Sequence, residues 1–430
     1  MNVDTLNPLA THPSMGGNLW FRKRLLAQIA KLRDCEIVFH DALGETHVGV
    51  AASVPADTLR ANVRVLDPEF YRILALGGSV GAGEAFRDGL WTCDDLVALV
   101  RIFVRNRDNL DAMETGLARV GGAMLRAYHS LRSNTRLGAR RNIAEHYDLG
   151  NKLFRLFLDD NLMYSSAVYA DPAESLETAS RRKLERICAK LDLQPGLRVV
   201  EIGSGWGGFA LHAAKHHGVH VTTTTISQEQ YDLAVDRVRE AGLGDRINVV
   251  MHDFRDLTGR YDRLVSIEMV EAIGAKLLDP YFAKMAELLS DDGLALVQAI
   301  TIEDHRYQQA LESVDFIKRH VFPGCFIPSI SAMLASLARA SNLRLTHLED
   351  IGPSYALTLA EWRRRFNAAH EEVRALGYSE NFVRLWNYYL AYCEGGFRER
   401  SIGDVQMLFA KPGNRRAQFL PDLGATACIR

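Results

Sequence analysis

The first quarter of the chain mixes helical and strand-like spacing of its apolar residues. Apolar residues recur at the period of an amphipathic helix from Phe21, and short strand-like runs follow over residues 35–68. The segment FYRILALGG is predicted as a helix that ends at Gly77 and Gly78, because glycine terminates helices, and DDLVALVRIFVRN is predicted as another helix. The pattern therefore predicts a small α+β domain over residues 20–115.

After residue 150, short apolar runs alternate with helical stretches. The runs RVVEIGSG, HVTTTTIS, INVVMHD, YDRLVSIEM and GLALVQAIT are predicted as buried strands. Two more, LRLTHLEDIG and VQMLFAKP, follow a helical insertion over about residues 306–340. Such alternation predicts an α/β class, with a seven-stranded, mostly parallel sheet covered by helices on both faces. This second domain is predicted over residues 143–412.

Residues 116–142, between the two domains, carry a one-sided charge. Six arginines and no acidic residue occur between positions 119 and 141, with apolar residues interleaved. Two interpretations stay open: a linker helix with a solvated basic face, or a surface that meets anionic lipid headgroups. The ends of the chain, residues 1–19 and 413–430, are predicted to be flexible tails.

Composition narrows the class of protein. Hydrophobic residues make up 47% of the 430 residues and charged residues 24%, which excludes extensive disorder. A net charge of −2 argues against a nucleic-acid binder. The six cysteines are scattered, with neither a CxxC pair nor a histidine at metal spacing, so we expect no metal site and a reducing cytosol. Neither a signal peptide nor an apolar run of bilayer length is visible, so any membrane contact is expected to be peripheral.

The segment EIGSGWGG carries the clearest chemical signal. It begins at Glu201, follows a predicted strand and opens a helix, and Gly203 and Gly205 let the backbone approach a ligand. A dinucleotide site would place an acid about twenty residues further on, but the sequence there is TIS. Asp253 and Phe254, after the third strand, suit the edge and the face of an adenine. The pattern favours S-adenosylmethionine over NAD.

Seven segments together give the chain a family likeness. Over residues 20–412 the chain resembles the cyclopropane-fatty-acyl-phospholipid synthase and mycolic acid methyltransferase family, whose fold is that of class I S-adenosylmethionine-dependent methyltransferases. The segments that carry the resemblance are EHYDLGNKLFRLFLDDNLMYSSAVY, VVEIGSGWGGFA, TTISQEQ, SIEMVEAIG, VDFIKRHVFPGC, PSYALTLAEWRRRF and NYYLAYCEGGFRER.

The resemblance implies methyl transfer to the cis double bond of an unsaturated acyl chain in a membrane phospholipid. It further implies an enzyme that lies at the inner face of the membrane, binds no nucleic acid and is compatible with a homodimer. An apolar pocket is needed to shield the carbocation that methyl transfer leaves, and aromatic faces can stabilise it. The cofactor-binding residues that the resemblance implies are Tyr164, Ser165, Gly203, Gly205, Thr225, Gln230, Asp253 and Phe254.

The family holds a bicarbonate ion as base, with a Cys, a Glu, a His and a Tyr. Glu271 and Tyr355 match two of these positions, whereas Ser166 stands at the Cys position and Gln298 at the His position. A hydroxyl and an amide can hydrogen-bond an anion, but neither carries positive charge as histidine can. The implied product is therefore either a cyclopropane or a methyl- or methylene-branched chain, with Glu271 itself an alternative base. Glu268 matches no family motif, and an ordinary structural role is expected for it.

Two other classes of function are weaker alternatives. A methyltransferase of small molecules or nucleic acid would share the glycine turn, but no NPPY-like tetrad is present. A lipid-binding module without catalysis would not be expected to keep that turn together with Glu271 and Tyr355. Aromatic candidates for the acyl pocket, most of them expected to be plain core, are Tyr307, Phe316, Phe322, Tyr355, Trp362, Tyr388 and Tyr389.

Overall fold

The computed structural model describes residues 15–108 and 150–417, which belong to two compact units, Met1–Gly121 and Gly122–Arg430. The arginine-rich segment predicted over residues 116–142 lies outside the described residues. The first helix begins at Met15, inside the stretch predicted as a tail. At the other end, residues 413 and 414 turn back, and the Gly413 N–H donates to the Asp291 carbonyl.

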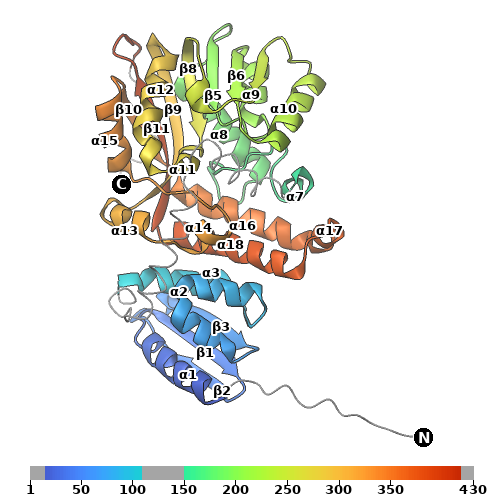
Figure 1. Ribbon diagram of the computed structural model, residues 1–430, viewed down its shortest axis with the longest axis vertical. Coiled ribbons are helices and arrows are strands. Elements are labelled where there is room, and N and C mark those ends of the chain that lie inside the picture. Colours follow the sequence, from blue (N-terminus) through green and yellow to red (C-terminus); the bar gives the residue numbers. More distant parts are fainter. Residues whose placement is uncertain (1–14, 109–149, 418–430) are drawn as a thin grey trace, which may run out of the picture. The chain divides into compact units, whose positions relative to one another are not determined.

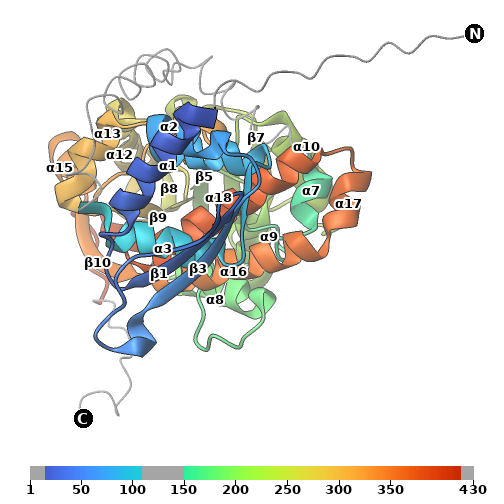
Figure 2. The same ribbon diagram turned by 90° about the horizontal axis from the view of Figure 1, so that it is seen from below.

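The first unit is a four-stranded sheet with helices. Its strand order is β2-β1-β3-β4, with β1 and β3 parallel and the two outer pairs antiparallel. Inward-facing residues of β1 and β3 are buried, and α1 packs beside α2 (Figure 2). The elements are α1 (Met15–Ile29), β1 (Cys35–Asp41), β2 (Gly44–Val48), η1 (Pro55–Asp57), β3 (Leu59–Val65), α2 (Glu69–Arg87), β4 (Trp91–Cys93) and α3 (Leu96–Arg105).

Helix α2 confirms one prediction and extends it. Helical geometry breaks at Gly78, whose φ of 54° and ψ of −137° are not helical, and a second helical segment follows directly after this kink and runs to Arg87. Beyond the kink, a Cβ on Gly81 would lie 2.4 Å from the Ile73 carbonyl oxygen. The glycines therefore let a helix turn sharply and pack tightly on itself, which the local sequence pattern cannot distinguish from termination.

The second unit alternates strands and helices. Its elements before the last parallel strand are α7 (Asn151–Arg155), α8 (Leu176–Leu191), β5 (Arg198–Ile202), α9 (Gly208–His217), β6 (His220–Thr224), α10 (Gln228–Glu240), β7 (Ile247–Val250), η2 (Phe254–Asp256), β8 (Tyr261–Ile267), α11 (Val270–Ile273), η3 (Ala275–Leu277) and α12 (Leu278–Leu288). The remainder are β9 (Leu289–Ile302), η4 (Asp304–Arg306), α13 (Tyr307–Glu312), α14 (Phe316–His320), α15 (Ile330–Ala340), β10 (Arg344–Asp350), α16 (Gly352–Ala368), α17 (His370–Ala375), α18 (Glu380–Arg398) and β11 (Ile402–Ala410).

The seven-stranded sheet predicted for this unit is confirmed. Its order is β10-β11-β9-β8-β5-β6-β7, parallel from β9 to β7, with β11 and β10 antiparallel at one side (Figure 1). One hydrophobic cluster joins the sheet to α8, α9 and α10, and another joins it to α11, α12 and α15. Helices thus cover both faces, as the alternating pattern predicts.

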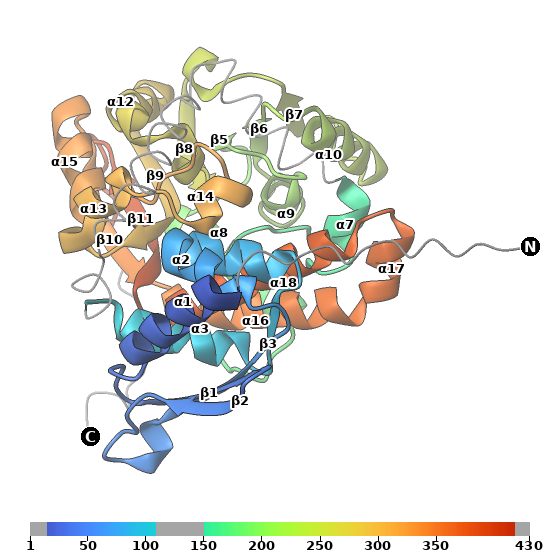
Figure 3. The same ribbon diagram turned by 60° about the horizontal axis from the view of Figure 1, so that its bottom comes forward.

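The direction in which successive strands are added to the sheet reverses between β5 and β8. From β5 the chain proceeds outward through β6 and β7, then returns to place β8 on the other side of β5. In open α/β sheets, ligands bind at such a switch point, beyond the carboxyl ends of the strands. Helices α16 and α18 pack against each other and against β11, whose first residues pair with the end of β9 (Figures 1 and 3). Across residues 15–108 and 150–417, no helix is both long and apolar enough to cross a membrane.

Candidate active site

The glycine-rich turn follows β5 at the switch point. Gly203 and Gly205 have φ values of 95° and 48°, in the region that glycine adopts without strain. A Cβ on Gly205 would meet no atom within 4 Å, whereas one on Gly208 would lie 2.5 Å from both the Asn161 carbonyl oxygen and the Met163 sulfur. The turn is therefore open at Gly205 and tightly covered where α9 begins.

Glu201, just before the turn, is buried at the end of β5. Its carboxylate accepts a hydrogen bond from the Thr223 hydroxyl at 2.6 Å. Burial raises the pKa of Glu201 to about 8. At neutral pH a protonated carboxyl therefore stands beneath the glycine turn.

The neighbouring strand ends carry the other residues predicted for the cofactor. The Thr225 hydroxyl, just after β6, donates to Gln230 Oε1 at 2.8 Å. After β7, Asp253 caps η2 and forms an ion pair with Arg255 at 2.7 Å. The Phe254 ring is buried in the core, with its centroid 5.8 Å from that of Tyr281. These residues therefore line the ends of β6 and β7, although Phe254 packs as a core residue.

Tyr164 and Ser165 lie on the segment that precedes α8. The Tyr164 hydroxyl is 2.9 Å from the Tyr389 hydroxyl, and its ring packs against Trp362 with centroids 5.3 Å apart. The Ser165 hydroxyl accepts a hydrogen bond from Lys183 Nζ at 2.7 Å. Aromatic rings from this segment, α16 and α18 thus pack together, and Tyr355 joins them through Phe397, with stacked centroids 4.4 Å apart.

Three other aromatic candidates make separate contacts. Phe316 pairs with Tyr388, at a centroid distance of 4.8 Å. Tyr307 packs against the hydrophobic cluster around α12 and α15.

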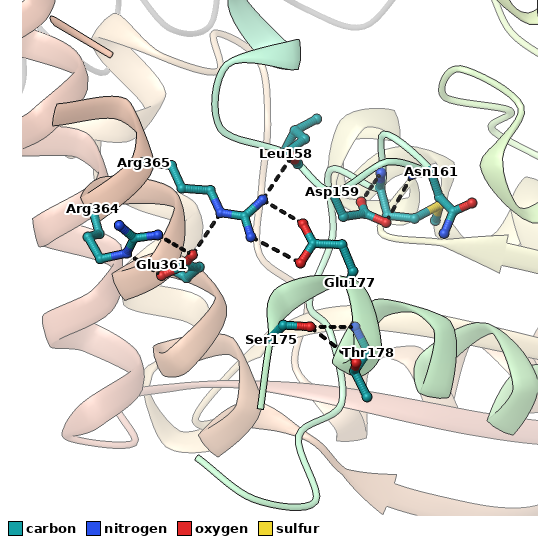
Figure 4. A network of polar contacts seen from close by, with 10 residues as sticks. Leu158, Asp159, Asn161, Ser175, Glu177, Thr178, Glu361, Arg364 and Arg365 are labelled. Carbon is teal, nitrogen blue, oxygen red and sulfur yellow. Dashed lines mark hydrogen bonds and ion pairs between the residues drawn. The ribbon is translucent and has the colours of Figure 1, made fainter. Parts of the chain in front are cut away.

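Polar contacts fix the segment just before Tyr164. Arg365, on α16, holds the Glu177 carboxylate with two hydrogen bonds of 2.8 and 3.2 Å and also donates to Glu361 at 2.7 Å (Figure 4). A longer hydrogen bond, of 3.4 Å, reaches the Leu158 carbonyl. Asp159 accepts the N–H groups of Asn161 and Met163 at 3.1 and 2.8 Å. The segment is therefore tied to both α8 and α16.

Glu268 is the centre of the polar cluster at the end of β8. It accepts hydrogen bonds of 2.8 Å from three groups: the Ser166 backbone N–H, Gln298 Nε2 and the Tyr355 hydroxyl. These three residues are those predicted to surround an anion, but Ser166 contributes its backbone, since its hydroxyl donates to the Ala167 carbonyl. The structure thus brings the predicted residues together around a side chain for which the sequence predicted an ordinary structural role.

The amide of Gln298 is oriented by its other partners. Its Oε1 accepts a hydrogen bond from Gln406 at 3.0 Å, so its Nε2 faces Glu268 and also donates to Asp404 at 3.2 Å. Gln406 in turn accepts from Lys190 at 2.6 Å. Burial, and then the charge of Glu268, raise the pKa of Asp404 well above its ordinary value. The buried layer behind Glu268 therefore fixes the orientation of the Gln298 amide, which presents a donor to the carboxylate.

Glu271 lies beside this cluster rather than within its hydrogen bonds. Its Oε1 accepts from the Ile300 N–H at 2.5 Å, and its Oε2 is enclosed without a hydrogen-bond partner in the described part of the chain. Burial, and then repulsion from Glu268, raise the pKa of Glu271 to about 8. Glu271 is therefore protonated at neutral pH, and an acid in that state can donate a proton but cannot accept one.

Four residues of the cluster were not predicted as site residues from the sequence: Glu268, Lys183, Asp404 and Gln406. The only signals were local: Glu268 directly follows a strand, Asp404 and Gln406 are polar in an otherwise apolar strand, and Lys183 is a lysine on the buried side of its helix. Burial lowers the pKa of Lys183, while the charge of Glu268 is the largest influence that raises it. None of these signals identifies a site without the fold.

A second grouping was also hidden by sequence distance. Ligand atoms of Cys188, His212 and His217 lie within 4.8 Å of one another, on α8 and α9. Burial raises the pKa of the Cys188 thiol, and Glu185 already pairs with both imidazoles at 2.8 and 3.2 Å. Sequence spacing did not reveal this grouping, because residues far apart in the chain are brought together by two neighbouring helices.

Comparison with known proteins identifies the family of the chain. The sequence profile of the family described as mycolic acid cyclopropane synthetase matches residues 134–407. The chain belongs to the mycolic acid cyclopropane synthetase family. The tuberculostearic acid methyltransferase UfaA1 of Mycobacterium tuberculosis is 34% identical over 91% of each chain. The cyclopropane-fatty-acyl-phospholipid synthase of Escherichia coli is 35% identical over 87% of this chain and 93% of its own.

Solved members of the family share the fold of the second unit. The cyclopropane synthase MmaA2 of Mycobacterium tuberculosis is 28% identical, with a TM-score of 0.59 over 63% of this chain and 98% of its own. The mycolic acid cyclopropane synthase CmaA1, solved with SAH and CTAB, is 29% identical with the same TM-score and coverage. This cyclopropane synthetase family member is thus a methyltransferase with a class I α/β fold and an additional N-terminal unit.

Proposed function

We propose that the chain transfers a methyl group from S-adenosylmethionine to the cis double bond of an unsaturated acyl chain in a membrane phospholipid. One observation carries the proposal. The glycine turn after β5 and the Glu268 cluster after β8 stand on adjacent strands, so an open cofactor turn and a group that can take a proton share one edge of the sheet. The names of the E. coli and mycobacterial relatives support a lipid substrate.

The proposed cofactor supplies an electrophilic methyl group when it is bound. We assign Gly203 and Gly205 to its amino-acid moiety, because the turn is open at Gly205. Thr225 and Gln230 are assigned to the ribose and Asp253 with Phe254 to the adenine, at the ends of β6 and β7. Tyr164 and Ser165 are assigned as further cofactor contacts, on the segment held by Lys183 and Tyr389.

The chain's own residues orient the acyl chain and handle the proton. The rings of Tyr164, Trp362 and Tyr355 would form an apolar, water-excluding wall whose faces stabilise positive charge. We propose Glu271, Tyr355, Gln298 and Ser166 as the catalytic group that holds the proton acceptor. Three of them already donate to one carboxylate, which supports this assignment.

Two products remain candidates within this activity. Cyclopropane formation follows from the family, whereas Gln298 and Ser166, in place of a histidine and a cysteine, favour a methyl- or methylene-branched chain. The test is mass spectrometry of vesicle acyl chains after reaction with cofactor that carries a trideuterated methyl group. Two retained deuterons indicate a cyclopropane or a methylene branch, which hydrogenation separates, and three indicate a methyl branch. No label in the lipid, with label in a soluble acceptor, would instead identify a small-molecule methyltransferase.

The proposed place of reaction is the inner face of the cytoplasmic membrane. The arginine-rich residues 119–141 supply the charge for contact with anionic headgroups. A homodimer is compatible with access to the lipid. The groups that would hold bicarbonate include Ser166, Gln298 and Tyr355, and all three already donate hydrogen bonds to Glu268.

A further inference from the structure

Glu268 has the surroundings of a bound anion. Its three donors come from three separate segments: the stretch before α8, strand β9 and helix α16. Both carboxylate oxygens are used, Oε1 by the Ser166 N–H and Gln298, and Oε2 by the Tyr355 hydroxyl. Donors that converge on a carboxylate from separate segments fix its orientation.

The backbone at Glu268 is held in an unfavourable conformation. Its φ of 47° lies in the left-handed region, which is unfavourable for a residue with a Cβ and costs glycine almost nothing. The residue stands at the turn between β8 and α11. The strained backbone and the three donors together indicate that the carboxylate has a use.

The carboxylate is accessible while its donors are buried. Glu268 is partly exposed, whereas Gln298 and Ser166 are 0% exposed and Tyr355 is 6% exposed. The nearby acids Asp404 and Glu271 have raised pKa values, through burial and then through Glu268, so their protonated forms are favoured. Burial lowers the pKa of the Lys183 ammonium, and the charge of Glu268 is the largest influence that raises it. The cluster therefore presents one carboxylate, backed by donors, to the edge of the sheet.

We propose that the Glu268 carboxylate is the proton acceptor of the reaction, built into the chain at the place where Ser166, Gln298 and Tyr355 would otherwise hold a free anion such as bicarbonate. This inference rests on the proposed function. The π pair of the alkene forms the new bond to the methyl carbon, and the pair of the broken carbon–sulfur bond stays on sulfur. For a cyclopropane, a C–H bond of the new methyl group breaks and its electron pair closes the ring onto the cationic carbon. For a branched product, a C–H bond on a carbon next to the cation breaks and its pair forms a double bond, after a 1,2-hydride shift where the product is a methylene branch. In each case the proton goes to a Glu268 oxygen.

The test uses the full-length protein with Glu268→Gln and Glu268→Gly, and with Glu287→Gln as a control on the exposed face of α12. Turnover on unsaturated phospholipid vesicles is measured in carbonate-free buffer and again with added bicarbonate or formate. Cofactor affinity and binding of carbon-13-labelled bicarbonate are measured in parallel. Glu268→Gln keeps the shape of the side chain and removes the base. Glu268→Gly also removes the base, but it relieves the backbone strain and leaves space for an anion among the three donors.

The expected results are specific. Wild type turns over equally with and without bicarbonate and binds none. Glu268→Gln loses about 10²-fold or more in kcat, the contribution of a positioned base, with unchanged cofactor affinity. Glu268→Gly binds one labelled bicarbonate and regains part of its turnover with added carboxylate. Glu287→Gln behaves as wild type.

Several outcomes would overturn the role of Glu268. These are wild-type turnover that needs bicarbonate, wild-type binding of bicarbonate, Glu268→Gln turnover within about threefold of wild type, or a cofactor-binding Glu268→Gly variant that no carboxylate restores. The wild-type reaction separates the two proposals. If wild type binds cofactor but methylates no acyl chain, the proposed function fails; if wild type is active and the variants contradict the expectation, only the role of Glu268 fails.

Discussion

Replacing Glu271 by glutamine changes how the stability of the protein depends on pH. The structure places this carboxyl in an enclosed position, one oxygen on the Ile300 N–H and the other without a hydrogen-bond partner in the described residues. Burial is the main cause, and Glu268 the second, of a pKa raised from 4.5 to about 8. Glutamine has the same shape, keeps an acceptor for the Ile300 N–H and never ionises.

The sign and size of the effect follow from proton linkage. Below the pKa that Glu271 has in the unfolded chain, its carboxyl is protonated in both states. Its contribution to the free energy of unfolding is then fully present. As the pH rises toward the folded pKa, only the unfolded state releases the proton, so the free energy of unfolding falls by about 1.4 kcal/mol per pH unit. The slope ends near pH 8, where the folded state also ionises. Glu271→Gln removes this contribution, whereas Glu201, which is also raised to about 8, titrates in both proteins.

The assay is urea unfolding of wild type and Glu271→Gln without cofactor, at several pH values between about 5 and 8.5. Among the ionisable groups near Glu271, Glu268 contributes most to its raised pKa, and Asp404 lies in the same cluster. Both are unchanged in the variant. The variant should gain stability relative to wild type steadily as the pH rises. If the two proteins show parallel pH dependence, Glu271 ionises normally and its assignment as a protonated, enclosed acid is refuted.

The remaining predictions concern activity, positioning and membrane contact. Tyr355→Phe removes one donor to the Glu268 carboxylate, so kcat should fall about 10- to 10²-fold, the equivalent of one hydrogen bond to a charged group, while cofactor affinity stays constant; unchanged kcat would contradict the cluster. Arg365→Ala should lower the free energy of unfolding by about 1–2 kcal/mol, because a two-bond ion pair that is 22% and 26% exposed at its side chains is lost; Arg364→Ala, whose side chain is 66% exposed, is the matched control and should cost less. Vesicle binding should need anionic lipid and weaken as salt rises, because the arginines at 119–141 act by charge; binding that ignores salt would remove that role.

Local sequence was sufficient for the elements and for the glycine turn. The periodicity of apolar residues predicts the alternating strands and helices of the second unit, and this periodicity depends only on nearby residues. The turn at Gly203 and Gly205 is likewise local, since it needs only a strand, glycines and a helix in succession. At Gly78 the same local reasoning predicted the break in helical geometry but not the second helical segment beyond it, because a kink and a helix end use the same residue for the same conformational freedom.

The centre of the site depended on contacts that no local pattern encodes. Glu268 meets Ser166, Gln298 and Tyr355 across 102, 30 and 87 residues of sequence, and Cys188 meets two histidines on a neighbouring helix. The family likeness marked four positions around an anion, but not Glu268, whose carboxylate contacts three of them. The sequence by itself determined an α/β chain with a cofactor-type turn. Only the tertiary structure decided which carboxylate stands among the donors, because burial, orientation and raised pKa values arise when distant strands and helices pack together.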